Sequence, residues 1–494
     1  MREEPMELVV GTAYGKVRGE VSDGVAAFKG IPYAAPPFGP NRMRPPVRPQ
    51  AWDDVRDATA YGPTAPKPPY PPPYDGLLPE PVIAGDDCLN LNVWTPDPGA
   101  AGLPVMVWIH GGAFVNGTGA IPDYTGDRFA RDGVVCVTIN YRLGCDGFLL
   151  LDDATPNRGL LDQIAALEWV QENIAAFGGD PGQVTIFGES AGGMSVTTLL
   201  SMPRAAGLFR RAIPQSGAGH HALPAETARI VTAELARRLG VAPTLAEVAA
   251  VPVDRLVAAQ FQLSGDLAMN PDPGRWREVS ANAMAFEPVV DGEILPARPI
   301  DGIAAGNGRG VDLLVGTNRD ENRMFLVPTG VVDFIDDASL ALVAGGLGLD
   351  AAGLAVYRSG AASAGDALAD VMTDWFFRIP AIRLVEQHHG AAYMYEFAWP
   401  TPVLGGRLGA CHALEIGFVF DTVDIEGGEV LYGASPPREL AATMHRAWAD
   451  FARSGRPGWD AYDLKTRATM TFDVDSALVH DPRPEQRALW DGIR

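Results

Sequence analysis

Apolar residues between positions 104 and 200 follow the pattern of a parallel sheet that is covered on both faces. Residues 104–109 and 134–141 are largely continuous apolar runs, which is typical of buried parallel strands. Over residues 160–177, large apolar side chains recur at spacings of three and four, which predicts a helix that ends at Gly178 and Gly179. This alternation of strand and helix predicts an α/β fold with a doubly wound sheet.

The alternation continues toward the end of the chain. Residues 184–187 and 312–316 predict two further buried strands, and residues 392–397 alternate as a strand does. A Ser-Pro-Pro sequence at residues 435–437 predicts the start of a helix that runs to about Arg453. No internal repeat or linker divides the chain, so we expect one domain over residues 1–494.

Residues 66–85 interrupt this pattern with eight prolines. Proline lacks a backbone N–H and fixes φ, which excludes a helix or a central strand here. One interpretation is a polyproline ligand for another protein. Because the flanking elements fix both ends of the segment, we instead predict a stiff surface loop within the domain.

The charge balance excludes several classes of partner. The chain has 39 lysines and arginines against 61 aspartates and glutamates, a net charge of −22, which argues against nucleic acid or an anionic membrane surface. No apolar run is long enough to cross a bilayer, and the charged residues 1–7 do not begin a secretion signal. We expect a cytoplasmic protein that is a monomer or a weak homo-oligomer.

A candidate nucleophile lies in the sequence Gly188-Glu189-Ser190-Ala191-Gly192, directly after the strand at residues 184–187. Small residues on both sides of a serine in a strand-to-helix turn let neighbouring backbone pass closely and leave the hydroxyl exposed. An exposed serine of this kind can attack an acyl group. The pattern is short, so other motifs must show whether it is more than a turn.

A serine nucleophile needs a base to accept its proton and a carboxylate to orient that base. Of eight histidines, His412 is the best candidate, because it lies in a loop of small residues late in the chain, where the order serine, acid, histidine places the base. Asp320 and Glu321 follow the strand at residues 312–316, at the edge where α/β sheets assemble their sites. Their spacing alone does not choose between them.

A further motif, His110-Gly111-Gly112-Ala113-Phe114, follows the strand at residues 104–109. Its small residues allow backbone N–H groups to approach a substrate closely, which predicts an oxyanion hole.

With these motifs placed, the chain resembles the type-B carboxylesterases of the α/β-hydrolase fold, most closely the bacterial branch that includes p-nitrobenzyl esterases. The resemblance covers nearly the whole chain. Besides the serine turn and the loop after residue 109, the motifs that carry it are residues 28–34, 87–93, 140–144, 177–181, 215–217, 288–292 and 418–420.

The resemblance implies a large, mostly parallel sheet with helices on both faces and with inserted loops and helices over an active-site gorge. It implies a serine carboxylesterase that hydrolyses small-molecule esters, short-chain or aromatic, through an acyl-enzyme and without a metal or other cofactor. Carbamate or amide hydrolysis on the same residues is an alternative. An inactive adhesion or binding member of the fold is another, and the presence of Ser190 argues against it.

The resemblance also assigns roles to individual residues. The nucleophile falls on Ser190, the acid on Glu321, the base on His412, the oxyanion donors on the amides of Gly112, Ala113 and Ala191, and a supporting hydroxyl behind the triad on Ser216. Phe114, Met324 and Phe325 lie within a few residues of these groups and are expected either to line an apolar substrate pocket or to belong to the core.

The chain departs from the family pattern at three places. Asn322 and Ala413 stand where the family has glycine after the acid and the base, so we expect different backbone angles there. The cysteine that pairs with the position of Cys88 in secreted members is absent, so that bridge cannot form. We hypothesise that the prolines of residues 66–85 replace it by restricting the unfolded chain.

Overall fold

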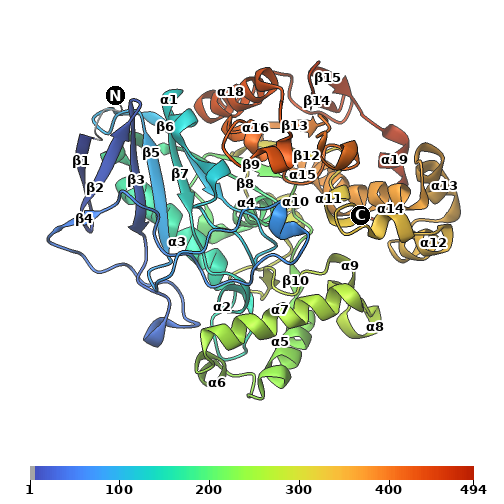
Figure 1. The fold of residues 1–494 in the computed structure, drawn as a ribbon, viewed down its shortest axis with the longest axis horizontal. Helices are drawn as coiled ribbons and strands as arrows, with labels where there is room; N and C mark the ends of the chain where they lie inside the picture. The colour runs from blue at the N-terminus through green and yellow to red at the C-terminus, as the bar shows by residue number, and fades with distance from the viewer. Residues whose placement is uncertain (1–5) are drawn as a thin grey trace.

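A sheet of thirteen strands runs through the computed structural model, which describes residues 6–494 (Figure 1). In order across the sheet the strands are β1 (Met6–Thr12), β2 (Gly15–Ser22), β3 (Val25–Pro32), β5 (Asn90–Thr95), β7 (Val135–Ile139), β6 (Leu103–Ile109), β8 (Gly179–Glu189), β9 (Arg211–Gln215), β12 (Asp312–Asn318), β13 (Ala392–Phe397), β14 (Ala468–Phe472) and β15 (Ala477–His480), with β4 (Val55–Asp57) beside β2. Strands β10 (Leu223–Pro224) and β11 (Val289–Val290) pair separately.

The middle of the sheet, from β7 to β14, is parallel. Along this path the N-terminal strands β1, β2, β3 and β5 and the last strand β15 are antiparallel to their neighbours, whereas β4 pairs with β2 in parallel. The prediction of a large, mostly parallel sheet is therefore confirmed, and antiparallel hairpins extend it at both edges.

Helices cover both faces of the sheet, because successive side chains of a strand point to opposite faces. In β6, Val105, Val107 and Ile109 belong to one buried core, and Met106 and Trp108 belong to the other. The first core is shared with α3 (Arg158–Asn173), α4 (Ala191–Ser201), α10 (Pro299–Ala304) and α15 (Ile379–Gln387). The second is shared with α1 (Asp127–Arg131), α16 (Ile416–Phe420) and α18 (Arg438–Ser454).

Two groups of inserted helices extend beyond the sheet, one at the bottom and one at the right of Figure 1. The first group is α5 (Ala225–Leu239), α6 (Leu245–Ala249), α7 (Val253–Met269), α8 (Pro273–Trp276) and α9 (Val279–Asn282). The second is α11 (Arg323–Leu326), α12 (Asp337–Gly346), α13 (Ala351–Gly360) and α14 (Ala364–Thr373). The remaining helices are α2 (Gly144–Phe148), α17 (Glu429–Tyr432) and α19 (Pro484–Leu489).

The element boundaries differ from the sequence expectations mainly at one strand. The expected helix over residues 160–177 is α3 followed by a 3-10 turn at Ile174–Phe177, and the expected helix to Arg453 is α18. Strand β8 begins at Gly179, earlier than the apolar run at 184–187, because Gly179 pairs with Leu103 across a shift of register. Hydrophobicity alone does not reveal such a bulged extension.

The proline-rich loop of residues 66–85 contains no strand or helix apart from a 3-10 turn at Tyr74–Gly76. The prediction of a surface loop holds only in part. The side chain of Lys67 is 1% exposed and that of Glu80 is 10% exposed, so the loop also packs into the interior.

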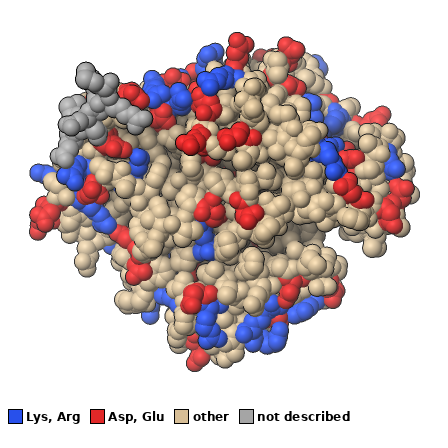
Figure 2. All heavy atoms as spheres, in the orientation of Figure 1, with Lys and Arg blue, Asp and Glu red and all other residues tan. Residues whose placement is uncertain are grey.

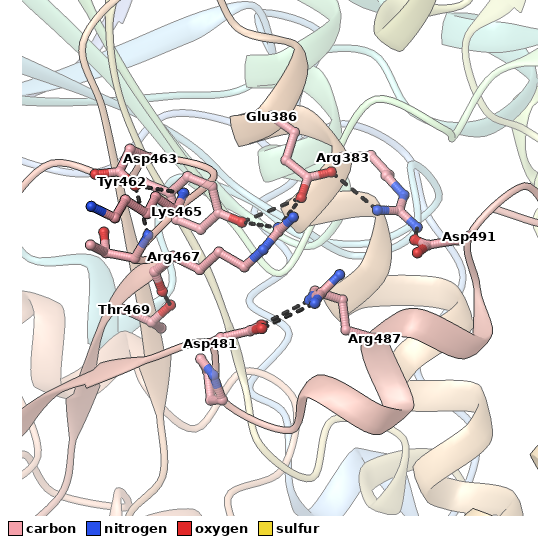
Figure 3. A network of polar contacts seen from close by, with 12 residues as sticks. Arg383, Glu386, Tyr462, Asp463, Lys465, Arg467, Thr469, Asp481, Arg487 and Asp491 are labelled. Atoms are coloured by element: carbon pink, nitrogen blue, oxygen red, sulfur yellow. Dashed lines mark hydrogen bonds and ion pairs between the residues drawn. The ribbon is translucent and has the colours of Figure 1, made fainter.

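A polar network fastens the C-terminal segment to the body of the protein (Figure 3). Arg467 forms an ion pair with Glu386 of α15, whose other oxygen lies 3.1 Å from Arg383. Arg487 of α19 holds Asp481 through two hydrogen bonds of 2.8 and 3.0 Å. Arg383 also lies 2.8 Å from Asp491, just after α19, so the network joins α15 to the segment before β14 and to the end of the chain.

Membrane spans and disulfide bonds are the subject of two expectations from the sequence. Over residues 6–494, no helix combines the length and the hydrophobicity that a membrane span requires. Cys88, Cys136, Cys145 and Cys411 are all buried free thiols. The expectation that residues 1–7 do not begin a secretion signal rests partly on residues 1–5, which lie outside the described residues.

Candidate active site

Ser190 occupies a strained turn between β8 and α4. Its backbone has φ 57° and ψ −123°, a conformation that is rare for a residue with a side chain and persists only where its surroundings impose it. A Cβ on Gly192 would lie 2.0 Å from the carbonyl oxygen of Ile109, and one on Gly217 would lie 2.3 Å from that of Ser190. Glycine is therefore required at both positions for the backbone to pass this close to the serine.

The loop after β6 lies directly beside this turn. A Cβ on Gly111 would lie 3.2 Å from Cβ of Ser190. Within residues 6–494, the N–H groups of Gly112 and Ala113 donate no hydrogen bond to another residue, and both residues line the same cavity as Ser190. Backbone donors that are free and close to a nucleophile are what a tetrahedral oxyanion requires.

Glu321, rather than Asp320, contacts the candidate base. Nδ1 of His412 lies 2.7 Å from Oε2 of Glu321, whose side chain is fully buried, and Oε1 of Glu321 accepts a hydrogen bond of 2.8 Å from the amide of Asn318. Asp320 instead accepts a hydrogen bond from the amide of Ala410 at 2.9 Å, which supports the loop that carries the histidine. The spacing in sequence left this choice open, and the fold decides it.

The two departures from the family pattern beside these residues have different outcomes. Ala413, after the histidine, has φ 66°, so alanine adopts the left-handed conformation that favours glycine. Asn322, after the acid, has ordinary helical angles of −72° and −11°. Ala413 therefore has a backbone angle that favours glycine and Asn322 does not, and the expected difference from the family's angles stays a prediction.

Two further acids act electrostatically on the histidine, and neither was given a role from the sequence. Oε1 of Glu189 lies 3.1 Å from Nε2 of His412. Glu415 accepts hydrogen bonds from Gln215 at 3.1 Å and from Asn318 at 2.7 Å. The available signal was proximity in sequence, since Glu189 precedes the serine and Glu415 follows the histidine by three positions.

Burial and mutual repulsion shift the pKa values of this cluster. Burial raises the pKa of Glu189 well above its usual value and that of Glu415 to about 7, and the neighbouring carboxylates add to both shifts. Burial alone would lower the pKa of His412, but the carboxylates of Glu189 and Glu321 outweigh it and raise that pKa to about 9. The imidazole is therefore the single cationic centre shared by three carboxyl groups.

The base and the serine face one cavity of about 690 Å³. The described residues that line it include four acids, Asp75, Asp123, Glu189 and Glu426, and no lysine or arginine. The rest of the lining is largely aromatic and aliphatic. On the face drawn in Figure 2, charged side chains lie mostly around the periphery.

The three residues expected near the substrate have different positions. Phe325 lines the cavity, and its ring centre lies 5.3 Å from that of His412. Phe114 is fully buried and packs on Phe148 at 4.8 Å, and Met324 is 1% exposed in the second core. These two residues belong to the buried cores and are not among the residues that line the cavity.

Other residues complete or qualify the site. Phe377, which was not predicted from the sequence, lies in the stretch between α14 and α15. The centre of its ring is 4.9 Å from that of His412. The hydroxyl of Ser216 is buried and forms no hydrogen bond with another described residue, so its supporting role stays a prediction. Within residues 6–494, no group of three or more His, Cys, Asp or Glu side chains could hold a metal ion.

Comparison with known proteins gives consistent matches along the chain. The model of the carboxylesterase family matches residues 6–339 and 351–490. The para-nitrobenzyl esterase of Bacillus subtilis (strain 168) is 40% identical, with 97% of each chain covered. The phenmedipham hydrolase of Pseudarthrobacter oxydans is 36% identical, with 95% of this chain and 94% of the relative covered.

Solved structures agree with these matches. A carboxylesterase of Geobacillus stearothermophilus superposes with a TM-score of 0.85 at 38% identity, covering 98% of this chain and 99% of the other. A PNB esterase superposes with a TM-score of 0.84 at 37% identity over the same shares of the two chains.

Proposed function

The chain belongs to the carboxylesterase family and is a carboxylic ester hydrolase, and from this premise we propose that Ser190, Glu321 and His412 are its catalytic triad. The observation that carries the proposal is the 2.7 Å contact between His412 and Glu321 at the wall of the cavity that Ser190 also lines. A strained serine, a paired imidazole and free amides in one cavity are the parts that acyl transfer requires.

In the proposed reaction, Oγ of Ser190 attacks the ester carbonyl carbon while Nε2 of His412 accepts its proton. The amides of Gly112, Ala113 and Ala191 donate to the oxyanion that forms. The intermediate collapses to an acyl-enzyme, and the leaving alcohol takes the proton from Nε2. Water then attacks the acyl carbon with His412 as base, which releases the acid and restores Ser190.

Within this scheme the hydrogen bond to Glu321 fixes Nδ1 of His412 as a donor, which leaves Nε2 as the basic nitrogen. Nε2 lies 3.1 Å from Glu189, and we propose that it turns toward Ser190 when substrate fills the cavity. Catalytic hydrogen bonds often tighten only in the complex with substrate.

Replacing Ser190 by alanine tests the triad. We expect turnover of a p-nitrophenyl ester to fall by on the order of 10⁴ or more, with the circular dichroism spectrum unchanged. A fluorophosphonate probe should label the wild type and not the variant. Undiminished turnover or labelling in the variant would refute the assignment of Ser190.

For the substrate we propose an uncharged short-chain or aromatic ester. The support is the apolar and aromatic lining of the cavity, with four acids and no lysine or arginine among its described residues, which disfavours a carboxylate on the substrate. A series of p-nitrophenyl esters of increasing acyl length, together with a p-nitrophenyl succinate, tests this. Preference for the succinate over the uncharged butyrate would contradict the proposal.

Carbamate or amide hydrolysis is the second candidate, because such substrates can form the same kind of serine intermediate. One relative, 36% identical, is named for hydrolysis of phenmedipham, so this compound belongs in the panel. Comparison of kcat/KM for the best ester and for phenmedipham would rank the two activities.

We propose a cytoplasmic location for the enzyme. All four cysteines are buried free thiols, a state that a reducing compartment maintains. Fractionation of the source cells, followed by immunoblotting, tests this proposal.

A further inference from the structure

The loop that carries the proposed oxyanion donors holds an unfavourable backbone conformation. Ala113 and Phe114 have φ values of 52° and 60°, although neither is glycine. Gly112 and Gly117 also have positive φ, 104° and 97°. Such a conformation persists only when the surrounding structure imposes it, so something outside the loop must hold it in place.

Part of the support comes from His110 at the start of the loop. Its Nδ1 lies 2.8 Å from the carbonyl oxygen of Gly111, and its ring stacks on Tyr141 at 4.4 Å. Because a peptide unit is planar and trans, fixing this carbonyl also fixes the direction of the N–H of Gly112, which points the opposite way. The hydrogen bond of His110 thus orients one of the proposed donors.

Gly117 packs against this hydrogen bond. A Cβ on Gly117 would lie 2.3 Å from both Nδ1 of His110 and the carbonyl oxygen of Gly111. The turn also closes internally, because the amide of Asn116 donates to the carbonyl of Gly112 at 2.8 Å. A displacement of Gly117 would therefore be transmitted to the peptide that bears the donor.

Lys67 and Glu80 of the proline-rich loop hold both polar groups of Gly117. Nζ of Lys67 donates to the carbonyl of Gly117 at 3.0 Å, and the amide of Gly117 donates to the two oxygens of Glu80 at 3.3 and 3.2 Å. Lys67 and Glu80 also form an ion pair with each other. Next to them, Nδ2 of Asn116 donates to the carbonyl of Pro68 at 2.7 Å.

Stability alone is a poor explanation for this pair. Its side chains are only 1% and 10% exposed, and a buried ion pair contributes little net stability compared with apolar residues of similar size. Neither side chain is among the residues that line the cavity. What the pair does provide is a matched donor and acceptor for the carbonyl and the amide of Gly117, which belong to two consecutive peptides of the loop, and so a fixed geometry.

We propose that Lys67 and Glu80 are positioning residues that hold the loop of residues 110–117 so that its amides face the oxyanion. The inference rests on the proposed function, since it assumes that Gly112 and Ala113 are the donors. It gives the proline-rich loop a role in the reaction rate, beyond the stabilising role that its prolines suggested.

The test compares variants that remove the pair with variants that preserve its hydrogen bonds. For Lys67→Met and for Glu80→Met we expect kcat to fall by on the order of 10-fold to 100-fold with KM within about twofold, because the lost interaction acts on the transition state. The inhibition constant of a trifluoromethyl ketone, which forms an oxyanion on the serine, should rise by the same factor. Glu80→Gln keeps an oxygen for the Gly117 amide and should retain most of the activity.

Two controls separate positioning from folding. The double variant Lys67→Met with Glu80→Met leaves no unpaired charge, so it should melt close to the wild type and still show the loss in kcat. Lys29→Met removes a more exposed ion pair, with Glu20 at 3.2 Å between β3 and β2, whose side chains are 20% and 33% exposed, and it should leave kcat unchanged. All rates are normalised to the sites titrated with a fluorophosphonate.

Recovery of wild-type kcat in the double variant, or an unchanged inhibition constant for the ketone, would overturn the inference. These outcomes leave the triad intact as long as Ser190→Ala is inactive. Full activity in Ser190→Ala would instead overturn the proposed function itself.

Discussion

Two clusters of carboxylates, one partly exposed and one buried, lie in opposite charge environments in this protein. In the C-terminal network of Figure 3, Glu386 has Arg383 and Arg467 as partners, and Asp481 has Arg487. In the candidate active site, Glu189 and Glu321 contact a single imidazole, that of His412, and Glu415 adds to the negative charge that acts on it.

The pKa values follow from this difference in partners. The hydrogen bond from Arg487 lowers the pKa of Asp481, so that side chain stays ionised and contributes stability that is lost as the pH falls through its pKa. Burial raises the pKa of Glu189, and the nearby imidazole of His412 offsets only part of that rise. Paired charges fasten the fold, whereas several acids buried around one imidazole raise the pKa values of Glu189, Glu415 and His412.

The largest effect should come from the acid that orients the base. We expect Glu321→Gln to lower kcat by on the order of 10³ or more, because the amide no longer stabilises the imidazolium or fixes its tautomer. Steady-state kinetics with a p-nitrophenyl ester measures this change. Asp320→Asn is the matched control, since Asp320 contacts the amide of Ala410, and a greater loss in this control would reverse the assignment of the acid.

The next effect concerns the stability that the C-terminal network of Figure 3 provides. Glu386→Gln should lower the free energy of unfolding by about 1–3 kcal/mol, because Arg383 and Arg467 lose a charged partner in a mostly buried setting. Urea denaturation measures the change, and kcat per folded molecule should stay the same.

Asp152→Asn is the control for that variant. Asp152 also pairs with an arginine, Arg229, at 2.9 Å, but its side chain is 72% exposed, so its loss should change stability much less. If Glu386→Gln and Asp152→Asn lowered the free energy of unfolding equally, or if Glu386→Gln lowered kcat, the distinction between the two clusters would be wrong.

The smallest effect should be a change in pH dependence. His412 accepts a proton only when it is neutral, and its pKa is raised to about 9, so kcat/KM of the wild type should rise with pH until about that value. Glu189→Gln removes the carboxylate that contributes most to the raised pKa. The midpoint of this rise should therefore move to lower pH.

Glu415→Gln should move the midpoint in the same direction by less, because its carboxylate contributes less to the raised pKa of His412. Profiles of kcat/KM against pH for the three proteins measure the order. Superimposable profiles would show that the carboxylates do not set the protonation of the base.

Much of the fold was predictable because its signals are local in sequence. The apolar runs of the central strands and the spacing of apolar residues in α3 identified the parallel core, and the Ser-Pro-Pro sequence at residues 435–437 identified the start of α18. The bulged start of β8 was not predictable, because pairing between Gly179 and Leu103 depends on a neighbouring strand.

The candidate site likewise has features that are local in sequence and features that depend on the fold. The serine turn and the loop after β6 have their own glycine patterns, since tight backbone passages exclude side chains. Phe114 and Met324 also lie beside site residues in sequence, yet both point into the core. Neighbouring residues in a tight turn point in different directions, and only the folded backbone determines which of them meets the cavity.

The sequence by itself determined the order of the functional motifs along the chain. An oxyanion loop follows one apolar run, a nucleophile turn follows a later one, and candidates for the acid and the base lie further along. The tertiary structure decided which carboxylate meets His412, which carboxylates crowd it, and how Lys67 and Glu80 reach Gly117. The physical reason is distance along the chain. Conformation at a turn depends on adjacent residues, whereas charge and burial depend on residues that only folding brings together.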